Sequence, residues 1–198
     1  MKKTRMNPRV YKMVLSAIMI ALSVVLSLVT IYKLPMGGEV TLFSMVPIIT
    51  ISWIFGPKWG LGAGLTLALV RMLMDSGTVF GYVSGAAAYT ILVMVDYILP
   101  FTLLGLGGVF RKVIKNRYWA IGVGTFMVCF LRFVCHFISG VTIWNSFAAG
   151  TAKKVVYLYS LTYNGSYMLP ETVLTIIGME LLAAFVFPKL DENGMLKH

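Results

Sequence analysis

The sequence predicts an all-α integral membrane protein with six transmembrane helices. Of its 198 residues, 59% are hydrophobic and only 12% are charged, whereas soluble domains carry about 25% charged residues. The mean hydropathy of +0.86 points the same way. Because apolar runs and short connections take up nearly the whole chain, we expect one membrane-embedded domain over residues 1–198 and no soluble catalytic domain.

Six apolar runs form the predicted helices. The first follows a basic segment, and its core, Val14–Ile31, is long enough to span a bilayer. No small-residue cleavage site follows it, so we interpret this run as a retained helix rather than a signal peptide. The second and third runs are short, so we expect them to stand nearly upright or to pack inside the bundle. The predicted helices cover about 13–32, 41–55, 59–75, 87–110, 118–143 and 168–188.

The connections are recognised by their turn-forming and polar residues. A Pro/Gly-containing loop, Lys33–Thr41, follows the first helix, and Ser76–Gly85 separates the third from the fourth. Residues 144–167 are rich in polar and aromatic side chains and predict a long loop before the last helix. Pro170 would then lie in the first turn of that helix, where proline is tolerated, and Glu171 would favour its N-terminus.

The distribution of basic residues orients the predicted bundle. Six helices put both termini on the same side of the membrane. The segments on that side contain twelve Lys and Arg residues, and those on the other side contain three. The positive-inside rule therefore predicts that both termini are cytoplasmic. The net charge of +10 does not indicate binding to nucleic acid, because the basic residues flank apolar runs instead of forming a stripe on a soluble face.

Two ionisable side chains lie at the same predicted depth on neighbouring helices. Asp96 comes fifteen residues before Arg111, and Arg132 comes fifteen residues after Arg117. Each therefore lies about 22 Å from the cytoplasmic boundary. His136 is one turn beyond Arg132 on the same helix face. Ionisable groups inside membrane spans are costly, so these residues are candidates for a functional site.

Two interpretations fit this arrangement. In the first, Asp96 and Arg132 form a structural ion pair, His136 is a hydrogen-bonded core imidazole and Trp144 lies at the membrane interface. In the second, Asp96 is the anion of a pocket for a flat, cationic heterocycle, because aromatic faces attract cations and an amide can read ring nitrogens. The other candidate residues of such a pocket are Tyr97, Arg132, His136, Trp144, Tyr159 and Asn164.

The remaining intramembrane polar residues and the cysteines predict little chemistry. Arg71 and Asp75 are spaced as an i,i+4 pair and are interpreted as structural, and Glu180 has no identifiable partner. Cys129 and Cys135 would lie about 240° apart around one helix, so no disulfide is expected.

Several motifs are absent from the sequence. It contains no P-loop, no His-Glu-x-x-His and no Gly-x-Ser-x-Gly. We therefore expect neither an enzyme nor a protein that binds a metal or a cofactor. Ala17 and Ala21, four residues apart on the first helix, would allow another helix to approach closely, although alanine is also simply common in membrane helices.

Four sequence blocks resemble a known family of membrane proteins. They are Leu34–Leu42 with Met45–Ile48, Asp96-Tyr97, Leu131–Gly140, and Tyr159–Asn164 with Tyr167–Pro170. In these blocks and in its predicted layout the chain resembles the thiamine-specific S-components, of the ThiT/YuaJ type, of energy-coupling factor (ECF) vitamin transporters. The blocks are spread over nearly the whole chain, and the last two are the most specific.

The resemblance implies a six-helix S-component fold in a prokaryotic cell membrane that captures thiamine from outside with high affinity. It implies substrate-binding roles for Asp96, Tyr97, Arg132, His136, Trp144, Tyr159 and Asn164. Some members carry a tryptophan in the first loop, where this chain has Met36-Gly-Gly-Glu39, so Glu39 is retained as a candidate ligand contact. The resemblance also makes Ala17 and Ala21 the docking face for a transmembrane coupling subunit, which connects to two ATPase subunits.

Two other functions compete with this expectation. An S-component for a thiamine precursor, such as hydroxymethylpyrimidine, would bind a ligand that lacks the cation. A self-sufficient, proton-coupled secondary carrier would use Asp96 and Glu180 as its proton-coupling groups and would need no ATPase partner.

Overall fold

The computed structural model describes residues 7–35, 37–79, 81, 83–144 and 153–192, most of which are helical. The helices are α1 (Pro8–Leu28), α2 (Val46–Phe55), α3 (Pro57–Val79), α4 (Ala86–Ile91), α5 (Leu99–Leu103), α6 (Arg117–Thr142), α7 (Lys153–Phe185) and α8 (Phe187–Glu192). A π-helical segment, Leu92–Ile98, joins α4 to α5, and short 3-10 turns follow at Leu104–Leu106 and Val109–Lys112. Strands β1 (Thr30–Lys33) and β2 (Glu39–Thr41) form an antiparallel hairpin.

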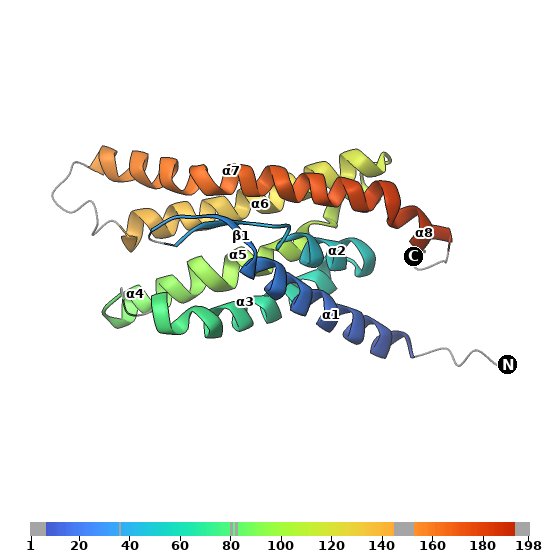
Figure 1. The fold of residues 1–198 in the computed structure, drawn as a ribbon, viewed down its shortest axis with the longest axis horizontal. Coiled ribbons are helices and arrows are strands. Elements are labelled where there is room, and N and C mark those ends of the chain that lie inside the picture. The colour runs from blue at the N-terminus through green and yellow to red at the C-terminus, as the bar shows by residue number, and fades with distance from the viewer. Residues whose placement is uncertain (1–6, 36, 80, 82, 145–152, 193–198) are drawn as a thin grey trace.

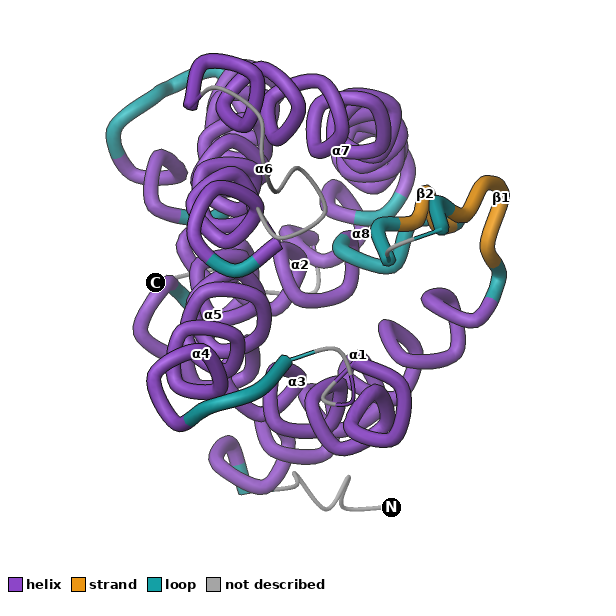
Figure 2. The backbone as a smooth tube through the Cα atoms, turned by 90° about the vertical axis from the view of Figure 1, so that its left-hand side faces the viewer, coloured by secondary structure: helices purple, strands orange, loops and turns teal. Residues whose placement is uncertain are grey.

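The long helices run side by side in an elongated bundle (Figure 1). α6 packs along α7, and α3 packs against α2 and α5. In the end-on view of Figure 2, α6 and α7 lie opposite α1 and α3, and the hairpin lies on the flank between α7 and α1. α1 begins and α8 ends at the same end of the bundle (Figure 1). Which side of the membrane this end faces stays a prediction.

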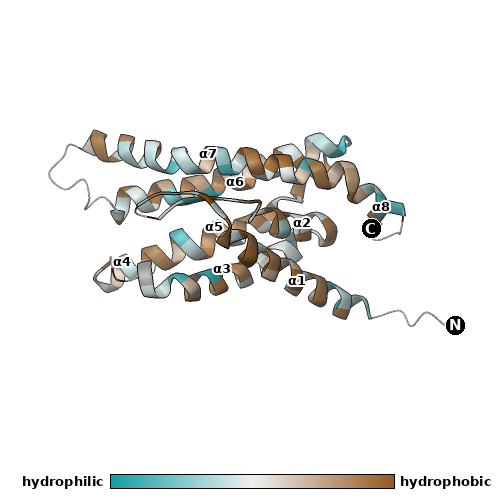
Figure 3. Cartoon of the chain, viewed as in Figure 1, coloured by the Kyte–Doolittle hydropathy of each residue, from teal (hydrophilic) through white to brown (hydrophobic). Residues whose placement is uncertain are grey.

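Among the described residues, four elements are long and apolar enough to cross a membrane. They are Pro8–Leu28, Ala86–Lys112, Arg117–Thr142 and Val155–Phe185. Figure 3 shows apolar residues along most of α1, and polar residues gathered on the first half of α7. The prediction of an all-α membrane protein is confirmed, whereas six complete crossings stay a prediction, because α2 has ten residues and α3 carries Arg71 and Asp75.

The short helix α2 forms the centre of the hydrophobic core. Nine of its ten residues, Val46–Ile54, are buried. At 1.5 Å per residue its length is about 15 Å, half the thickness of the hydrocarbon layer. The prediction that this short helix packs inside the bundle is confirmed. Its predicted start at 41 was too early, because Thr41 belongs to β2 and Phe43 has a positive φ of 62°.

The first connection is a hairpin rather than a plain loop, which corrects the predicted end of the first helix at 32. α1 ends at Leu28, and residues from Thr30 onward pair with β2 in an antiparallel register. Gly37 and Gly38 both have positive φ values, 84° and 81°, which turn the chain between the strands. A side chain at Gly38 would overlap the ring of Tyr167, so the turn lies directly against α7.

Most of the predicted loop 144–167 is helical, which corrects that prediction. Residues 145–152 lie outside the described residues, but α7 begins at Lys153 and runs without a break to Phe185. Pro170 therefore lies inside this helix and not in its first turn. The polar and aromatic side chains that suggested a loop instead occupy the first half of α7, where Ser160, Asn164 and Tyr167 are buried.

The helical path around Asp96 is irregular. Asp96 and Tyr97 belong to the π-helical segment Leu92–Ile98, in which the chain turns more widely than in an α-helix. Pro100, two residues after this segment, has no backbone N–H, so it cannot bond to the carbonyl of Asp96 four residues earlier. Single π-helical turns of this kind occur often at functional sites.

Close helix packing on α3 depends on particular glycines. A methyl group at Gly60 would overlap the backbone carbonyl oxygen of Gly105 and the side chain of Ser52. Gly62, on the same helix, has open space where its Cβ would be.

We therefore predict that Gly60→Ala destabilises the folded protein by about 1–3 kcal/mol through overpacking. Gly62→Ala is the matched control and should leave stability unchanged or slightly raised, because alanine is the better helix former. Thermal unfolding of the detergent-solubilised variants measures both effects. Equal midpoints for the two variants would contradict the close contact between α3 and Gly105.

Candidate substrate-binding site

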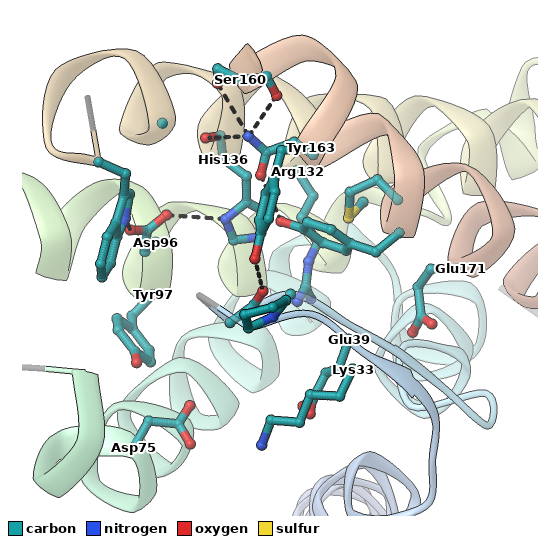
Figure 4. A pocket seen from close by; sticks show the side chains of 18 of the residues that line it. Lys33, Glu39, Asp75, Asp96, Tyr97, Arg132, His136, Ser160, Tyr163 and Glu171 are labelled. Atoms are coloured by element: carbon teal, nitrogen blue, oxygen red, sulfur yellow. Dashed lines mark hydrogen bonds and ion pairs between the residues drawn. The ribbon is translucent and has the colours of Figure 1, made fainter. Parts of the chain in front are cut away.

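A cavity of about 580 Å³ lies between the hairpin, α3, the π-helical segment, α6 and α7. Figure 4 shows side chains from each of these elements pointing into it. Its lining includes Lys33, Pro35, Gly37, Gly38, Glu39, Arg71, Asp75, Asp96, Tyr97, Phe101, Arg132, His136, Gly140, Trp144, Tyr159, Ser160, Tyr163, Asn164, Tyr167, Met168 and Glu171. All eight substrate-binding residues predicted from the sequence are in this set, so the fold brings together residues from four separate stretches of the chain.

The Asp96 carboxylate accepts hydrogen bonds from three donors of one neighbouring segment. Ser139 of α6 donates its hydroxyl, and Trp144, just beyond α6, donates its indole N–H over 3.2 Å. His136 Nδ1 lies 3.1 Å from the other carboxylate oxygen. The Asp96 and His136 side chains are both largely buried, with exposed fractions of 15% and 13%. The carboxylate is therefore held rigidly at the wall of the cavity.

Arg132 does not pair with Asp96, which corrects the structural interpretation of these two charges. Its guanidinium lies 4.3 Å from the ring centroid of Phe101, over the ring face. Among the described residues, no lysine or arginine forms an ion pair with Asp96, whose partners are instead His136, Ser139 and Trp144. The equal depth predicted for Asp96 and Arg132 did not decide which side chains meet.

His136 keeps one ring nitrogen available. Its Nε2 is buried and has no hydrogen-bond partner in the described structure. With Nδ1 protonated towards Asp96, Nε2 carries a lone pair and can accept a hydrogen bond. A buried acceptor without a partner is costly, so this atom is suited to a donor group on a ligand.

One face of α7 supplies three tyrosines to the cavity at intervals of four residues. Tyr159 and Tyr163 stack with their centroids 5.7 Å apart, and Tyr163 meets Tyr167 edge to face at 6.3 Å. The Tyr163 hydroxyl also donates to the Gly37 carbonyl at the turn of the hairpin. These aromatic faces provide a surface for a flat, cationic ring.

Asn164 lines the cavity, but its amide is already engaged by the protein. Its nitrogen donates to the carbonyls of His136 and Ser160, at 3.2 and 2.9 Å, and its oxygen accepts from Tyr167. Asn164 thus fixes α7 against α6 beside His136. Its direct contact with a ligand, as the resemblance implied, stays a prediction.

A cluster of charged side chains from the hairpin and α3 also lines the cavity. Arg71 forms ion pairs with Glu39 at 3.2 Å and with Asp75 at 3.4 Å, and it also donates to Ser27 of α1. The predicted i,i+4 pair of Arg71 and Asp75 is confirmed. Lys33 of β1 extends towards the same part of the cavity (Figure 4). We call Lys33, Glu39, Arg71 and Asp75 the Arg71 cluster.

Glu171 anchors the hairpin to α7. Its carboxylate accepts from the Thr41 backbone N–H at 2.6 Å and from the Thr41 hydroxyl at 2.7 Å. The residue is 5% exposed and lies well inside α7. The expectation that Glu171 favours a helix N-terminus was therefore wrong, because the helix starts eighteen residues earlier at Lys153.

Sequence reasoning missed several cavity residues, and most of them share one cause. Tyr163 and Tyr167 continue the i,i+4 series that begins at Tyr159, but that series has meaning only on a helix, and residues 144–167 were predicted as a loop. Glu171 was predicted within the last helix but was interpreted only as a charge near its N-terminus. Lys33 gave no signal, because an isolated lysine in a loop is ordinary. The partner-interface candidates Ala17 and Ala21 lie away from the cavity, on the exposed face of α1.

A bundle of apolar helices around an aromatic, charge-lined cavity defines a membrane-embedded protein that binds a small polar molecule. Comparison with known proteins gives the family. Residues 13–190 match the family described as thiamine transporter protein. The chain is 34% identical over 178 residues to the thiamine transporter ThiT of Bacillus subtilis (strain 168), covering 84% of this chain and 86% of that protein.

A second relative agrees with this assignment. The chain is 27% identical over 157 residues to the thiamine transporter ThiT of Lacticaseibacillus paracasei (strain ATCC 334), covering 75% of this chain and 74% of that protein. The chain therefore belongs to the thiamine transporter family.

We predict that Glu171→Ala loosens the hairpin. The substitution leaves the Thr41 N–H without its charged acceptor, and such a hydrogen bond contributes about 1.5–3 kcal/mol. Hydrogen–deuterium exchange at the hairpin amides should become faster by at least about tenfold. Glu180→Ala, a carboxylate of the same helix outside the cavity, is the control and should leave hairpin exchange unchanged. Equal exchange rates in the two variants would contradict the anchoring role of Glu171.

Proposed function

We propose that this protein is the high-affinity thiamine-binding subunit of an ATP-driven uptake transporter of the energy-coupling factor type. In this proposal it captures thiamine in the cavity from outside the cell and delivers it inwards together with partner subunits. Membership in the thiamine transporter family supports the substrate. What we propose beyond this is that the chain binds thiamine while partner subunits hydrolyse ATP.

The observation that carries the proposal is that Asp96 is largely buried without a lysine or arginine partner among the described residues. The position of its counter-ion is therefore open to a cationic ligand. The thiazolium of thiamine carries a fixed positive charge and a flat ring. Aromatic faces from Trp144 and the α7 tyrosines surround the same space. In a cavity that excludes water, attraction between cation and carboxylate is much stronger than in bulk solvent.

The overall charge of the cavity favours a cation as well. Its described lining contains four carboxylates, Glu39, Asp75, Asp96 and Glu171, and three cationic side chains, Lys33, Arg71 and Arg132. With His136 neutral, the formal net charge of these groups is −1, which is opposite and equal to the charge of a thiamine cation. The free Nε2 of His136 is suited to accept from the amino group of the pyrimidine ring.

Two features support dependence on partner subunits. The sequence has no P-loop, so ATP hydrolysis of that kind would have to occur on another chain. Ala17 and Ala21 are exposed on α1, where small side chains permit close approach of another membrane helix. In the proposed orientation both termini lie in the cytoplasm of a prokaryotic cell and the cavity opens outwards, because most basic residues flank the terminal side.

The competing functions make different demands on the same cavity. A precursor such as hydroxymethylpyrimidine has no fixed cation and would leave the net negative charge uncompensated. Competition binding with thiamine and hydroxymethylpyrimidine separates these two ligands. A secondary carrier using Asp96 and Glu180 would transport thiamine in liposomes that contain this chain alone, whereas the proposal expects no uptake without the partner subunits and ATP.

We predict that Asp96→Asn weakens thiamine binding by at least about 100-fold, because the amide keeps the shape but removes the charge that meets the thiazolium. Titration of the purified protein followed by tryptophan fluorescence measures this, since Trp144 lines the cavity. Glu180→Gln removes a carboxylate outside the cavity and is the matched control, with affinity unchanged. An affinity of Asp96→Asn within about twofold of the unaltered protein would refute the role of Asp96.

The partner interface gives a separate prediction. Ala17→Leu should leave thiamine binding in detergent unchanged, because Ala17 is exposed on α1 and is not among the residues that line the cavity. The larger side chain should abolish co-purification with the coupling subunit by blocking close helix approach. Ala87→Leu, at an exposed alanine of α4, is the control and should co-purify normally. Normal co-purification of Ala17→Leu would contradict the proposed interface.

A further inference from the structure

The cavity has two charged regions, and the proposed function uses only one of them. Asp96, with His136 and Trp144, meets the cation. The Arg71 cluster lines another part of the same cavity and comes from different elements, with Lys33 and Glu39 on the hairpin and Arg71 and Asp75 on α3. Thiamine has a third chemical part besides its two rings, a hydroxyethyl arm on the thiazolium that ends in an alcohol. This arm needs a polar partner if water is excluded.

Tyr97 connects the two regions. It is adjacent to Asp96 in the π-helical segment, and its hydroxyl donates a hydrogen bond to the Asp75 carboxylate. Figure 4 shows the Tyr97 ring between Asp96 and Asp75. A thiazolium placed against Asp96 therefore has Tyr97 as its neighbour on the way to the Arg71 cluster. An arm that extends along this ring points towards Asp75 of the cluster.

The charges of the cluster compensate one another. Arg71 is shared between Glu39 and Asp75, and both carboxylates are largely buried, with exposed fractions of 23% and 29%. Lys33 supplies a second cation beside Asp75. Two carboxylates and two cationic side chains can donate to and accept from a neutral alcohol without losing their own pairing.

A phosphate group at the same place has the opposite effect. It would bring up to two negative charges next to Glu39 and Asp75, and it could reach Arg71 and Lys33 only by competing with those carboxylates. The repulsion is strong because the cluster is partly withdrawn from water.

We propose that the Arg71 cluster is the subsite for the alcohol arm of the ligand and that Glu39 and Asp75 make the cavity select the free alcohol over its phosphate esters. The inference rests on the proposed thiamine-binding function and names the part of the cavity that sets specificity. Glu39 and Asp75 act as specificity-determining residues, whereas Asp96 meets the cation that thiamine and its esters share.

The experiment compares thiamine with thiamine monophosphate. Kd values for both ligands are measured by tryptophan fluorescence on the purified full chain. Removing one carboxylate, in Asp75→Asn, frees cationic capacity for the phosphate. The ratio of the monophosphate Kd to the thiamine Kd should therefore fall at least about fivefold. Glu39→Gln removes the other partner of Arg71 and should shift the ratio in the same direction, which gives an independent readout if one variant fails to fold.

Asp96→Asn is the contrasting variant. It should weaken both ligands by similar factors and leave the ratio unchanged, because both carry the thiazolium. An unchanged ratio in the folded Asp75→Asn and Glu39→Gln variants would overturn the subsite, as would an unaltered protein that binds both ligands equally well. Failure of the unaltered protein to bind thiamine at all would instead refute the proposed function.

Discussion

The buried carboxylate of Asp96 places the strongest constraint on this structure. A charge in the interior of a membrane protein is tolerated only when nearby groups stabilise it. Here the donors come from His136, Ser139 and Trp144, all on α6 or immediately after it. These hydrogen bonds require the π-helical segment to pack against the end of α6 that carries His136 and Ser139. The two elements together form one wall of the cavity. The three hydrogen-bond donors stabilise the carboxylate without a formal positive charge, which a cationic ligand would supply.

A second constraint shapes the opposite wall. The hairpin is fastened to α7 through Glu171 and Tyr163, and to α3 through the pair of Glu39 and Arg71. Several of these residues also line the cavity. The same contacts that hold the hairpin in place therefore set the shape and charge of the site. A substitution at Glu171 or Arg71 would consequently change both the stability of the protein and the shape and charge of the cavity.

Prediction from the sequence succeeded where a residue's role depends on its own chemistry. Asp96, Arg132 and His136 are polar groups within apolar runs, and all three line the cavity. Prediction failed where the role depends on the conformation of a long stretch. Tyr163 and Tyr167 were missed because residues 153–167 were predicted as a loop, and the hairpin was missed because β1 has only four residues and β2 three.

By itself the sequence determined that the chain is an all-α membrane protein, because composition and hydropathy report directly on the cost of burying each residue in lipid. Only the tertiary structure decided the partners of the charges. Asp96 pairs with His136 and not with Arg132, and Arg71 joins Glu39 to Asp75. Such pairings depend on distances of a few ångströms between separate helices, which the periodicity of a single helix does not contain.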